Sequence, residues 1–493
     1  MPVKTNVTKT AKSSDAHVYF LPEAFKSKDL KSLAINEDVK ELYKKAKSKR
    51  AFEEKAGALL SFEHGFITYV FQIADRKETA VFFKLEAARK IYETLSASSV
   101  KSANVYLDLI SEEEGLAAAD ALTSAFVAGN HNLPVYKKEK AKPEASLHLT
   151  FVTKSSVKIS KAVSLATSSA EAGNKIRDLL FMPANILDPK GFHEICKKEA
   201  SENGFSFKYH SFAELSKKGA GAFCAVAGAA PKSGAGIAEI TYSPKTTSKK
   251  LKHVVFVGKG ITFDTGGVNV KPGISMLGMK GDMGGAATAY AMLNLAKKQK
   301  WNVKVTAILA ICDNKISDSA YQPDEVIKSL SGKTIEIIHT DAEGRMALAD
   351  ALYLASQNRP DLLIDFATLT GASVRAIGNA YSSFFSNNDD YIEKFTIAGK
   401  VSGERVWPFP IDEDFGRCLS SNVADIKQCR PSGGCDHIEA AIFLKEFIGS
   451  VKNWIHVDLS SAKGDGPLAH VATKESGFGP RLIQKFLQEI KFI

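Results

Sequence analysis

No uninterrupted apolar run in this sequence reaches the ~20 residues that a membrane-spanning helix needs. The longest candidate, around Gly115 to Gly129, is rich in alanine and is interrupted by Asp120. The segment MPVKTNVTKTAKSSD at the start of the chain also lacks the apolar core of a secretory signal. Its basic, Ser/Thr-rich composition is shared with transit peptides, but we expect a frayed tail. The sequence therefore predicts a protein that does not span a membrane.

Cysteine is scarce, with six residues in a chain of 493. None of them forms a Cys-x-x-Cys pair, and no disulfide framework is expected at this length. Cys429 and Cys435 flank a Pro-Ser-Gly-Gly turn that could belong to a zinc ribbon or a redox switch, but two thiols without partner ligands argue against both. A reducing, cytoplasmic compartment fits this cysteine usage best.

The composition is that of an ordinary globular protein, with 44% hydrophobic, 24% charged and 9% aromatic residues. The length allows up to three domains and a large buried core. Lys and Arg outnumber Asp and Glu by 65 to 55, which raises the question of an anionic partner such as nucleic acid. The basic runs at 44–50 and 137–140 are interleaved with or flanked by acids and lack stacking aromatics, which favours solvated helix faces.

The first part of the chain mixes short apolar strands with helical stretches and predicts a smaller N-terminal α/β domain over residues 1–165. The expected strands include 66–73 and 104–110, and the expected helices include 38–56 and 113–128. A helical stretch at 163–180 is followed by Pro183 and the turn-prone Asn185, which should end it. We place the domain boundary near the start of this stretch and expect a C-terminal domain over 166–493.

The middle of the chain carries largely apolar runs, which are typical of strands covered on both faces of a parallel sheet. These runs span 253–257, 303–311, 334–338 and 362–366. Helical stretches at 284–297 and 346–355 alternate with them, so the expected class is α/β with a central, largely parallel sheet. Ligands bind such sheets at the carboxyl ends of the strands, and the polar clusters of this sequence follow those ends.

Four acidic residues fall at these expected strand ends and helix starts, namely Asp264, Asp282, Asp341 and Glu343. In a partly buried site their charges would repel one another strongly, and divalent cations would relieve the repulsion. The spacing of Asp341 and Glu343 predicts that both side chains point to one side of an extended segment and bridge two metals about 3.5–4 Å apart. A single Gly-rich loop with an acid is more typical of turns and helix caps, but the combination indicates a two-metal hydrolase site.

Two lysines, Lys259 and Lys271, accompany these acids in the sequence. Either lysine taken alone would be interpreted as a salt-bridge partner. Beside two cations, however, a lysine can lose its proton and act as a nitrogen ligand, or it can polarise a carbonyl group.

The runs VGKGITFDTGG, KGDMGG and TDAEGR together resemble the leucyl aminopeptidase family, M17, whose members are hexameric dizinc cytosolic exopeptidases. The resemblance extends from about Arg177 onward and includes RDLLFMPAN, SGKTIEIIHTDAEGRMALADAL and ATLTGA. It implies a two-domain α/β fold, with a smaller N-terminal domain and a larger C-terminal catalytic domain, assembled as a dimer of trimers. It also implies a metalloprotease that releases leucine-like N-terminal amino acids from peptides.

The resemblance implies two divalent metal ions per chain. The tighter site corresponds to Lys259, Asp264, Asp282 and Glu343, and the exchangeable site corresponds to Asp264, Asp341 and Glu343. Zinc is the expected metal, with manganese, cobalt or magnesium as alternatives at the exchangeable site. All five ligand positions carry the residue type that the family pattern requires.

The resemblance also assigns catalytic and substrate-binding positions. Lys271 corresponds to the residue that polarises the scissile carbonyl, and Arg345 to the residue that holds a bicarbonate ion acting as general base. The resemblance further implies that a water bridging the two metals attacks the carbonyl. It also implies that Asp282 and one of the metals receive the free α-amine of the substrate. The implied substrate contacts are Lys271, Met279, Asp282, Thr368, Leu369 and Gly371.

The sequence departs from the family pattern at several positions. His339 stands where asparagine is usual, and 268–270 reads Val-Asn-Val before Lys271. Ser460 and Lys463 stand where apolar residues often line the specificity pocket, so we expect basic, polar or small first residues to be accepted too. His437 and His456 lack the spacing of zinc ligands, and we expect structural roles for both.

Two alternative functions remain open at this stage. The basic charge permits an additional DNA-binding role, which salt-dependent retention on duplex DNA would reveal. A catalytically silent structural homologue is the other alternative, which the intact ligand set disfavours and which the metal content would test.

Overall fold

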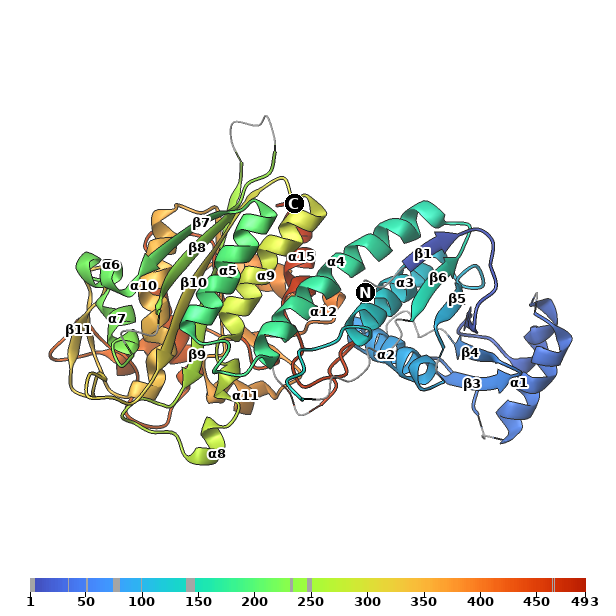
Figure 1. Ribbon diagram of the computed structural model, residues 1–493, viewed down its shortest axis with the longest axis horizontal. Helices are drawn as coiled ribbons and strands as arrows, with labels where there is room; N and C mark the ends of the chain where they lie inside the picture. Colours follow the sequence, from blue (N-terminus) through green and yellow to red (C-terminus); the bar gives the residue numbers. More distant parts are fainter. Residues whose placement is uncertain are drawn as a thin grey trace. The chain divides into compact units, whose positions relative to one another are not determined.

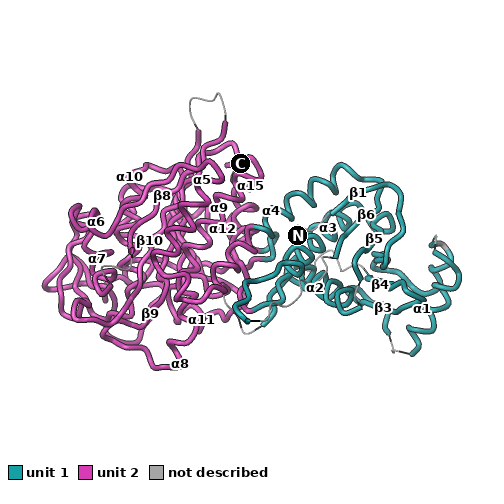
Figure 2. Tube along the Cα trace, viewed as in Figure 1, with its two compact units in different colours: residues 1–171, 400–403, 466–473 teal, residues 172–399, 404–465, 474–493 magenta. Residues whose placement is uncertain are grey.

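The structure is a computed structural model, and it describes residues 5–33, 35–49, 52–73, 80–98, 100–138, 147–230, 234–245, 251–462, 464 and 466–493. The chain divides into two compact units (Figure 2). Unit 1 comprises Met1–Glu171, Lys400–Gly403 and Gly466–Thr473, and unit 2 comprises Ala172–Gly399, Glu404–Asp465 and Lys474–Ile493. None of the described helices has the length and apolar character that crossing a membrane requires.

Unit 1 is built on a six-stranded sheet with the order β1-β6-β5-β2-β4-β3, in which β3 pairs antiparallel and the other pairs are parallel. The elements up to α4 are β1 (Thr5–Thr8), β2 (Ala16–Leu21), η1 (Ser27–Ser32), α1 (Glu37–Lys49), β3 (Leu59–His64), β4 (Ile67–Ile73), α2 (Val81–Ala97), β5 (Ser102–Tyr106), α3 (Glu112–Gly129), β6 (His148–Val152) and α4 (Ser156–Phe181). Leu85 of α2 and Leu122 of α3 share a buried cluster with Val105 of the sheet. Tyr43 of α1 and Phe71 of β4 belong to a second cluster.

Two expectations for unit 1 are wrong. The N-terminal segment is not a frayed tail throughout, because Thr5–Thr8 form an edge strand that pairs with Leu149 to Val152 of β6. This strand is held by main-chain hydrogen bonds, which do not require apolar side chains. Its polar sequence therefore gave no sign of a strand. The helix expected over 38–56 is shorter, because α1 spans Glu37–Lys49 and residues 52–55 are not helical; Phe52 packs edge-on against Tyr43, with the ring centroids 6.4 Å apart.

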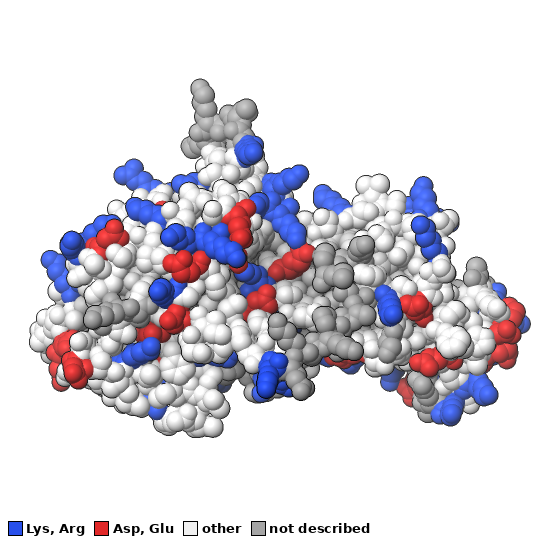
Figure 3. Space-filling view, in the orientation of Figure 1, with Lys and Arg blue, Asp and Glu red and all other residues white. Residues whose placement is uncertain are grey.

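Some of the basic side chains are paired with acidic ones on the same helix. In α1, Nζ of Lys40 lies 2.8 Å from Glu37 and Nζ of Lys44 lies 2.6 Å from Glu41, one helical turn away in each case. On the face shown in Figure 3, acidic side chains lie among the basic ones. Part of the basic charge is therefore paired with acidic side chains nearby.

Unit 2 is built on an eight-stranded sheet with the order β15-β14-β17-β13-β9-β10-β8-β7. The central strands β17, β13, β9 and β10 are parallel, whereas β14, β8 and β7 pair antiparallel with their inner neighbours. The elements after α4 are α5 (Pro189–Asn203), β7 (Ser206–Ser211), α6 (Phe212–Lys218), α7 (Gly221–Ala227), β8 (Gly236–Tyr242), β9 (His253–Asp264), α8 (Gly273–Met276), η2 (Met279–Gly281), α9 (Gly284–Gln299), β10 (Lys304–Asn314), β11 (Val326–Lys328), β12 (Thr334–Glu336), η3 (Thr340–Ala342), α10 (Glu343–Gln357), β13 (Leu362–Ala367), α11 (Gly371–Ile377), β14 (Ser382–Ser386), α12 (Asp389–Ser402), β15 (Val406–Pro408), α13 (Glu413–Gly416), η4 (Arg417–Leu419), β16 (Ile426–Lys427), α14 (Asp436–Lys445), β17 (Trp454–Asp458) and α15 (Pro480–Glu489). The expected α/β class is confirmed.

The central sheet of unit 2 is covered by helices on both faces (Figure 1). Along β9, Val254 and Phe256 belong to the buried cluster that includes α5, α9 and α15, while Val255 and Val257 belong to the cluster that includes α7, α10 and α14. Because both faces are buried here, the positions from Val254 to Val257 are all apolar. This double burial is the origin of the continuous apolar runs in the sequence.

The strand expected over 334–338 does not join this sheet. Only Thr334–Glu336 are extended, and they form β12 of a separate three-stranded sheet with the order β11-β12-β16. The following residues turn into η3, where the carbonyl oxygen of Thr340 accepts hydrogen bonds from Tyr321 and Asn314. These long-range contacts, which no local pattern signals, determine the path of the chain at Asp341.

Candidate metal site and adjoining cavities

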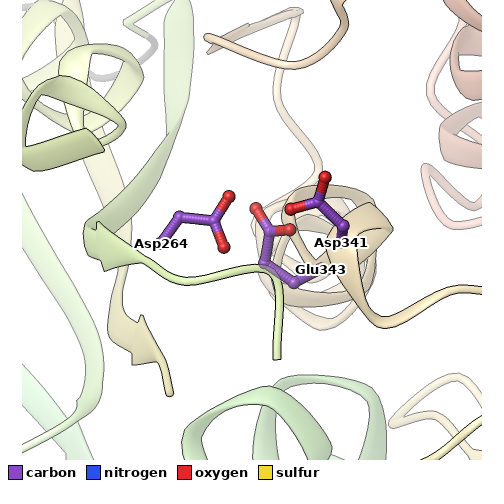
Figure 4. Close-up of side chains that lie close together, drawn as sticks. All are labelled: Asp264, Asp341 and Glu343. Atoms are coloured by element: carbon purple, nitrogen blue, oxygen red, sulfur yellow. The ribbon is translucent and has the colours of Figure 1, made fainter. Parts of the chain in front are cut away.

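Asp264, Asp341 and Glu343 bring their carboxylates together at the end of β9 (Figure 4). Asp264 is the last residue of β9, Asp341 lies in the 3-10 turn η3, and Glu343 is the first residue of α10. One carboxylate oxygen from each lies within 4.8 Å of the other two. The extended geometry expected for the Asp341 and Glu343 pair is wrong, because a turn and a helix start hold them. The two side chains nevertheless converge.

The two lysines lie between the carboxylates. Nζ of Lys259, within β9, lies 2.8 Å from Oδ2 of Asp282 and 3.0 Å from Oε1 of Glu343. Nζ of Lys271 lies 2.8 Å from Oδ2 of Asp264 and 2.6 Å from Oδ1 of Asp341. The structure therefore brings all four acids and both lysines into one site.

The loop that carries Lys271 is tied to the turn that carries Asp341. The side-chain carbonyl of Asn269 accepts a hydrogen bond of 2.8 Å from the backbone N–H of Thr340, and the Thr340 hydroxyl accepts one of 2.9 Å from the backbone N–H of Asn269. The Thr340 hydroxyl also donates to the carbonyl oxygen of Gly266 at 2.6 Å. The Val-Asn-Val departure noted in the sequence thus supplies the residue that joins these two segments.

Burial makes the charges of this cluster unfavourable. Desolvation, together with the charge of Asp264, raises the pKa of Glu343 to about 8, and desolvation raises the pKa of Asp282 to about 6. Burial alone would lower the pKa of Lys259, but the carboxylates of Asp282 and Glu343 outweigh it, so the pKa is raised. Ligation of a metal through this nitrogen therefore requires release of a proton.

The donor set fits divalent cations. Carboxylate oxygens are ligands for zinc, manganese and magnesium, and buried acids of like charge are stabilised by bound cations. Among the described residues, Oδ2 of Asp282 and Oδ1 of Asp341 are buried and receive no hydrogen bond, although a lysine Nζ lies close to each. These oxygens are available to a metal.

A cavity of about 400 Å³ opens at the carboxylates. Every residue proposed from the sequence as a ligand or substrate contact lines it, namely Lys259, Asp264, Lys271, Met279, Asp282, Asp341, Glu343, Thr368, Leu369 and Gly371. Thr368 donates a hydrogen bond of 2.8 Å to Oδ1 of Asp282. Asp458 accepts hydrogen bonds from the backbone N–H of Leu369 and the hydroxyl of Thr370, which fixes the segment that follows β13.

Arg345 lies in a second cavity of about 510 Å³, which shares Asp341, Glu343 and Leu369 with the first. Its guanidinium is buried and donates to Oδ1 of Asp436 at 2.6 Å and to the carbonyl oxygen of Gln428 at 3.1 Å. Arg345 therefore lies beside the carboxylate cluster without lining the first cavity.

Sequence reasoning missed several residues of the site. Asn314 ends β10 and donates a hydrogen bond of 2.8 Å to Oδ1 of Asp264, and its position at the carboxyl end of an apolar run was a usable signal. Arg375, Arg430 and Asp436 line the second cavity, and no local spacing connects them with the ligand motifs.

His437 and His456 line neither cavity. Nδ1 of His456 lies 2.6 Å from Oδ1 of Asp365. The other oxygen of Asp365, Oδ2, accepts a hydrogen bond of 2.7 Å from the indole N–H of Trp454. The ring of His437 packs edge-on against Phe409, with centroids 4.6 Å apart. All six cysteines lie in the described part of the chain and are free thiols.

Known proteins with similar sequences belong to the family that the sequence motifs resemble. A family model for the catalytic domain of the cytosol aminopeptidase family matches residues 174–484, more than half of the chain. A probable cytosol aminopeptidase of Phytoplasma australiense is 33% identical over 395 residues, which cover 78% of this chain and 78% of that protein. A probable cytosol aminopeptidase of Wolbachia pipientis wMel is 34% identical over 413 residues, covering 82% of this chain and 80% of that protein.

Solved structures are similar over nearly the whole chain. A variant of tomato leucine aminopeptidase matches with a TM-score of 0.86 and 25% identity, covering 98% of this chain and 96% of that chain. The bottromycin maturation enzyme BotP in complex with Mn matches with a TM-score of 0.82 and 27% identity, covering 97% of this chain and 100% of that chain.

Proposed function

The chain belongs to the cytosol aminopeptidase family and is an aminopeptidase, and we propose that it hydrolyses the first peptide bond of peptides with two divalent cations at its carboxylate cluster. The observation that carries this proposal is the convergence of Asp264, Asp341 and Glu343 within 4.8 Å. The manganese in the BotP complex supports a metal-dependent reaction here.

The residues that would hold the cations are Lys259, Asp264, Asp282, Asp341 and Glu343. When bound there, two divalent cations activate the attacking water and polarise the scissile carbonyl. We propose zinc as the metal, with manganese, cobalt or magnesium as alternatives at the exchangeable site.

Lys271 is positioned to stabilise the charge that develops on the carbonyl oxygen. Burial alone would lower its pKa, but Asp264 and Asp341 raise it, so the ammonium keeps its proton. It lines the first cavity and is held by two carboxylates, which orients it before the substrate binds. On the same cavity wall, Asp282 receives the free α-amine, and Thr368 orients the carboxylate of Asp282.

Arg345 is the residue that would hold a bicarbonate ion, whose chemistry is to accept a proton from the attacking water. Its place in the second cavity, next to Asp341 and Glu343, supports this role. The guanidinium of Arg345 donates hydrogen bonds to Asp436 and to the carbonyl oxygen of Gln428, and these bonds fix the plane of the group.

The pocket for the first side chain has a polar wall. Ser460 lines the first cavity, and its hydroxyl lies 2.5 Å from that of Ser373, which in turn contacts the hydroxyl of Ser383. This chain of hydroxyls supports acceptance of polar and small first residues in addition to leucine. Lys463 lies outside the described residues.

The family resemblance also supports a homohexamer, and the names of the relatives support a cytoplasmic location. Light scattering on the purified protein tests the first of these proposals, because six chains of 53.3 kDa differ clearly from one.

The decisive experiment is hydrolysis of aminoacyl-amides after chelation and stepwise addition of zinc, manganese or cobalt, with bound metal counted in parallel. The proposal expects activity that returns as the metal content approaches about two ions per chain and that requires a free α-amine. N-acetylated substrates provide the control. Full activity without metal would contradict the proposal.

A further inference from the structure

The two cavities meet at the carboxylate cluster, where both are lined by Asp341, Glu343 and Leu369. The first cavity holds Lys271 and the residues proposed to receive the first residue of the substrate. A peptide whose scissile carbonyl lies at the carboxylates must extend its leaving portion away from that cavity. The second cavity adjoins the shared residues, and its volume of about 510 Å³ is typical of small-ligand sites.

Three arginines line the second cavity. Arg345 pairs with Asp436 at 2.6 Å, and Nη2 of Arg430 lies 2.8 Å from Oε1 of Glu439. Arg375 is exposed, and it forms no ion pair within the part of the chain that the structure describes. Outside the metal cluster, three guanidinium groups therefore share two acids, Asp436 and Glu439, and Arg375 acts on Asp436 through its charge without forming an ion pair.

Arg430 is anchored by one ion pair. Its side chain is 38% exposed, whereas that of its partner Glu439 is only 1% exposed. Gly434 has a φ of +82°, and a Cβ atom there would lie 2.6 Å from Oε1 of Glu439 and 2.7 Å from Nε of Arg430. The absence of a side chain at Gly434 thus makes room for this ion pair. A guanidinium held in this way loses less conformational entropy when it binds a carboxylate.

His339 lines the same cavity. Its Nδ1 accepts a hydrogen bond of 3.2 Å from the backbone N–H of Asp341, which leaves Nε2 as the donor of the ring. Besides the carboxylates of Asp341, Glu343 and Asp436, the cavity lining therefore includes three guanidinium groups and the His339 ring.

We infer that the second cavity binds the residue after the scissile bond and prefers a carboxylate there, held by Arg375 and Arg430. That carboxylate is either the side chain of an acidic second residue or the C-terminus of a dipeptide. The inference rests on the proposed function, because hydrolysis of the first peptide bond defines which part of the substrate leaves.

Two matched pairs of substrates test the inference. Leu-Glu-amide and Leu-Gln-amide differ in the charge of the second side chain, and Leu-Gly and Leu-Gly-amide differ in the charge of the C-terminus. At about pH 8 both carboxylates are ionised. We expect kcat/KM to be roughly threefold to tenfold higher for the acidic member of at least one pair, and the ratio to fall as salt is added.

Variants connect this ratio with the two arginines. Arg375→Gln and Arg430→Gln are each expected to lower the acid-to-amide ratio, and the double variant is expected to bring it close to one. Lys445→Gln is the control, because Lys445 is an exposed cation at the end of α14 that lines neither cavity. It should leave the ratio unchanged.

The outcomes separate the two proposals. A preference in the first pair alone assigns the subsite to a side-chain carboxylate, and a preference in the second pair alone assigns it to a C-terminal carboxylate; both support the inference. Ratios near one in both pairs, or ratios that persist in the double variant, overturn it. No hydrolysis of any of the four substrates by the metal-loaded enzyme contradicts the proposed function instead.

Discussion

Gly285 packs so closely against Phe366 that a Cβ atom on Gly285 would lie 2.0 Å from the carbonyl oxygen of Phe366. The same Cβ atom would lie 2.9 Å from the backbone nitrogen of Lys259. Helix α9 can therefore approach strands β9 and β13 only where a side chain is missing. This contact sets the distance between the start of α9, which follows Asp282, and the strand that carries Lys259 and Asp264.

Substitution of Gly285 by alanine tests this packing. We expect Gly285→Ala to lower the free energy of unfolding by about 1–3 kcal/mol, because the backbone atoms it meets cannot move aside freely. Gly273→Ala is the matched control, since a Cβ atom there meets nothing within 4 Å. Thermal unfolding of both variants checks the prediction, and equal stability of the two would refute it.

Asp341→Asn is expected to bind about one metal ion per chain instead of two and to lose most of its activity. An amide is a poorer ligand than a carboxylate and leaves the remaining cation charge less compensated. Metal content measured alongside turnover checks both effects, with the exposed Asp318→Asn as control. Turnover equal to that of the unmodified chain would remove Asp341 from the ligand set.

Lys271→Ala is expected to keep both metals and to lower kcat by about 10²–10³-fold, the usual cost of removing one donor to a developing oxyanion. KM should change much less, because the interaction is made mainly in the transition state. Lys271→Arg should recover part of kcat. If both variants turned over at the unmodified rate, Lys271 would have no part in the chemical step.

Ser460→Ala is expected to shift the selectivity toward apolar first residues. The variant removes the hydroxyl that the first cavity presents and leaves Ser373 and Ser383 behind it. The ratio of kcat/KM for leucine-amide to that for threonine-amide should rise roughly threefold to tenfold, consistent with the loss of one hydrogen bond. A strict leucine preference in the unmodified enzyme would contradict the premise.

Glu404 provides a test of stability against pH. Its carboxylate is buried and accepts a hydrogen bond of 2.8 Å from the backbone N–H of Leu482, near the start of α15, and burial raises its pKa to about 7. Between the unfolded pKa of about 4.5 and pH 7, the unfolded chain has released this proton and the folded chain still holds it. The free energy of unfolding should therefore fall as pH rises through this interval.

Glu404→Gln removes this titration and can still accept the hydrogen bond from Leu482. Thermal unfolding of both proteins at pH 4.5 and pH 8 should show a smaller decrease in Tm for the variant. A parallel decrease in the two proteins would show that Glu404 does not titrate differently in the folded chain.

The sequence predicted the central sheet well, because burial on both faces requires mostly apolar residues along β9, β10 and β13. It predicted the edges of the fold poorly. Thr5–Thr8 form a strand through main-chain pairing with β6, and the path of the chain after β12 depends on hydrogen bonds to Thr340 from Tyr321 and Asn314. Neither interaction leaves a periodic pattern.

For the site, the sequence motifs located the residues that surround the first cavity, because each motif lies at a strand end or a helix start. The second cavity was missed. It joins Arg345 to the segment from Cys429 to Asp436, more than 80 residues further along the chain, through an ion pair with Asp436. Only the folded chain brings these two segments together.

The edge position of β1 affects the tendency of the protein to self-associate. Residues Thr5–Thr8 cover the outer side of β6 along its register from Leu149 to Val152. Trimming this short segment would make β6, with the more apolar sequence HLTFV, the edge of the sheet in place of the polar TNVT of β1. The polar edge strand therefore lowers the tendency to pair with another molecule, and trimmed forms of the chain should self-associate more readily than the untrimmed chain.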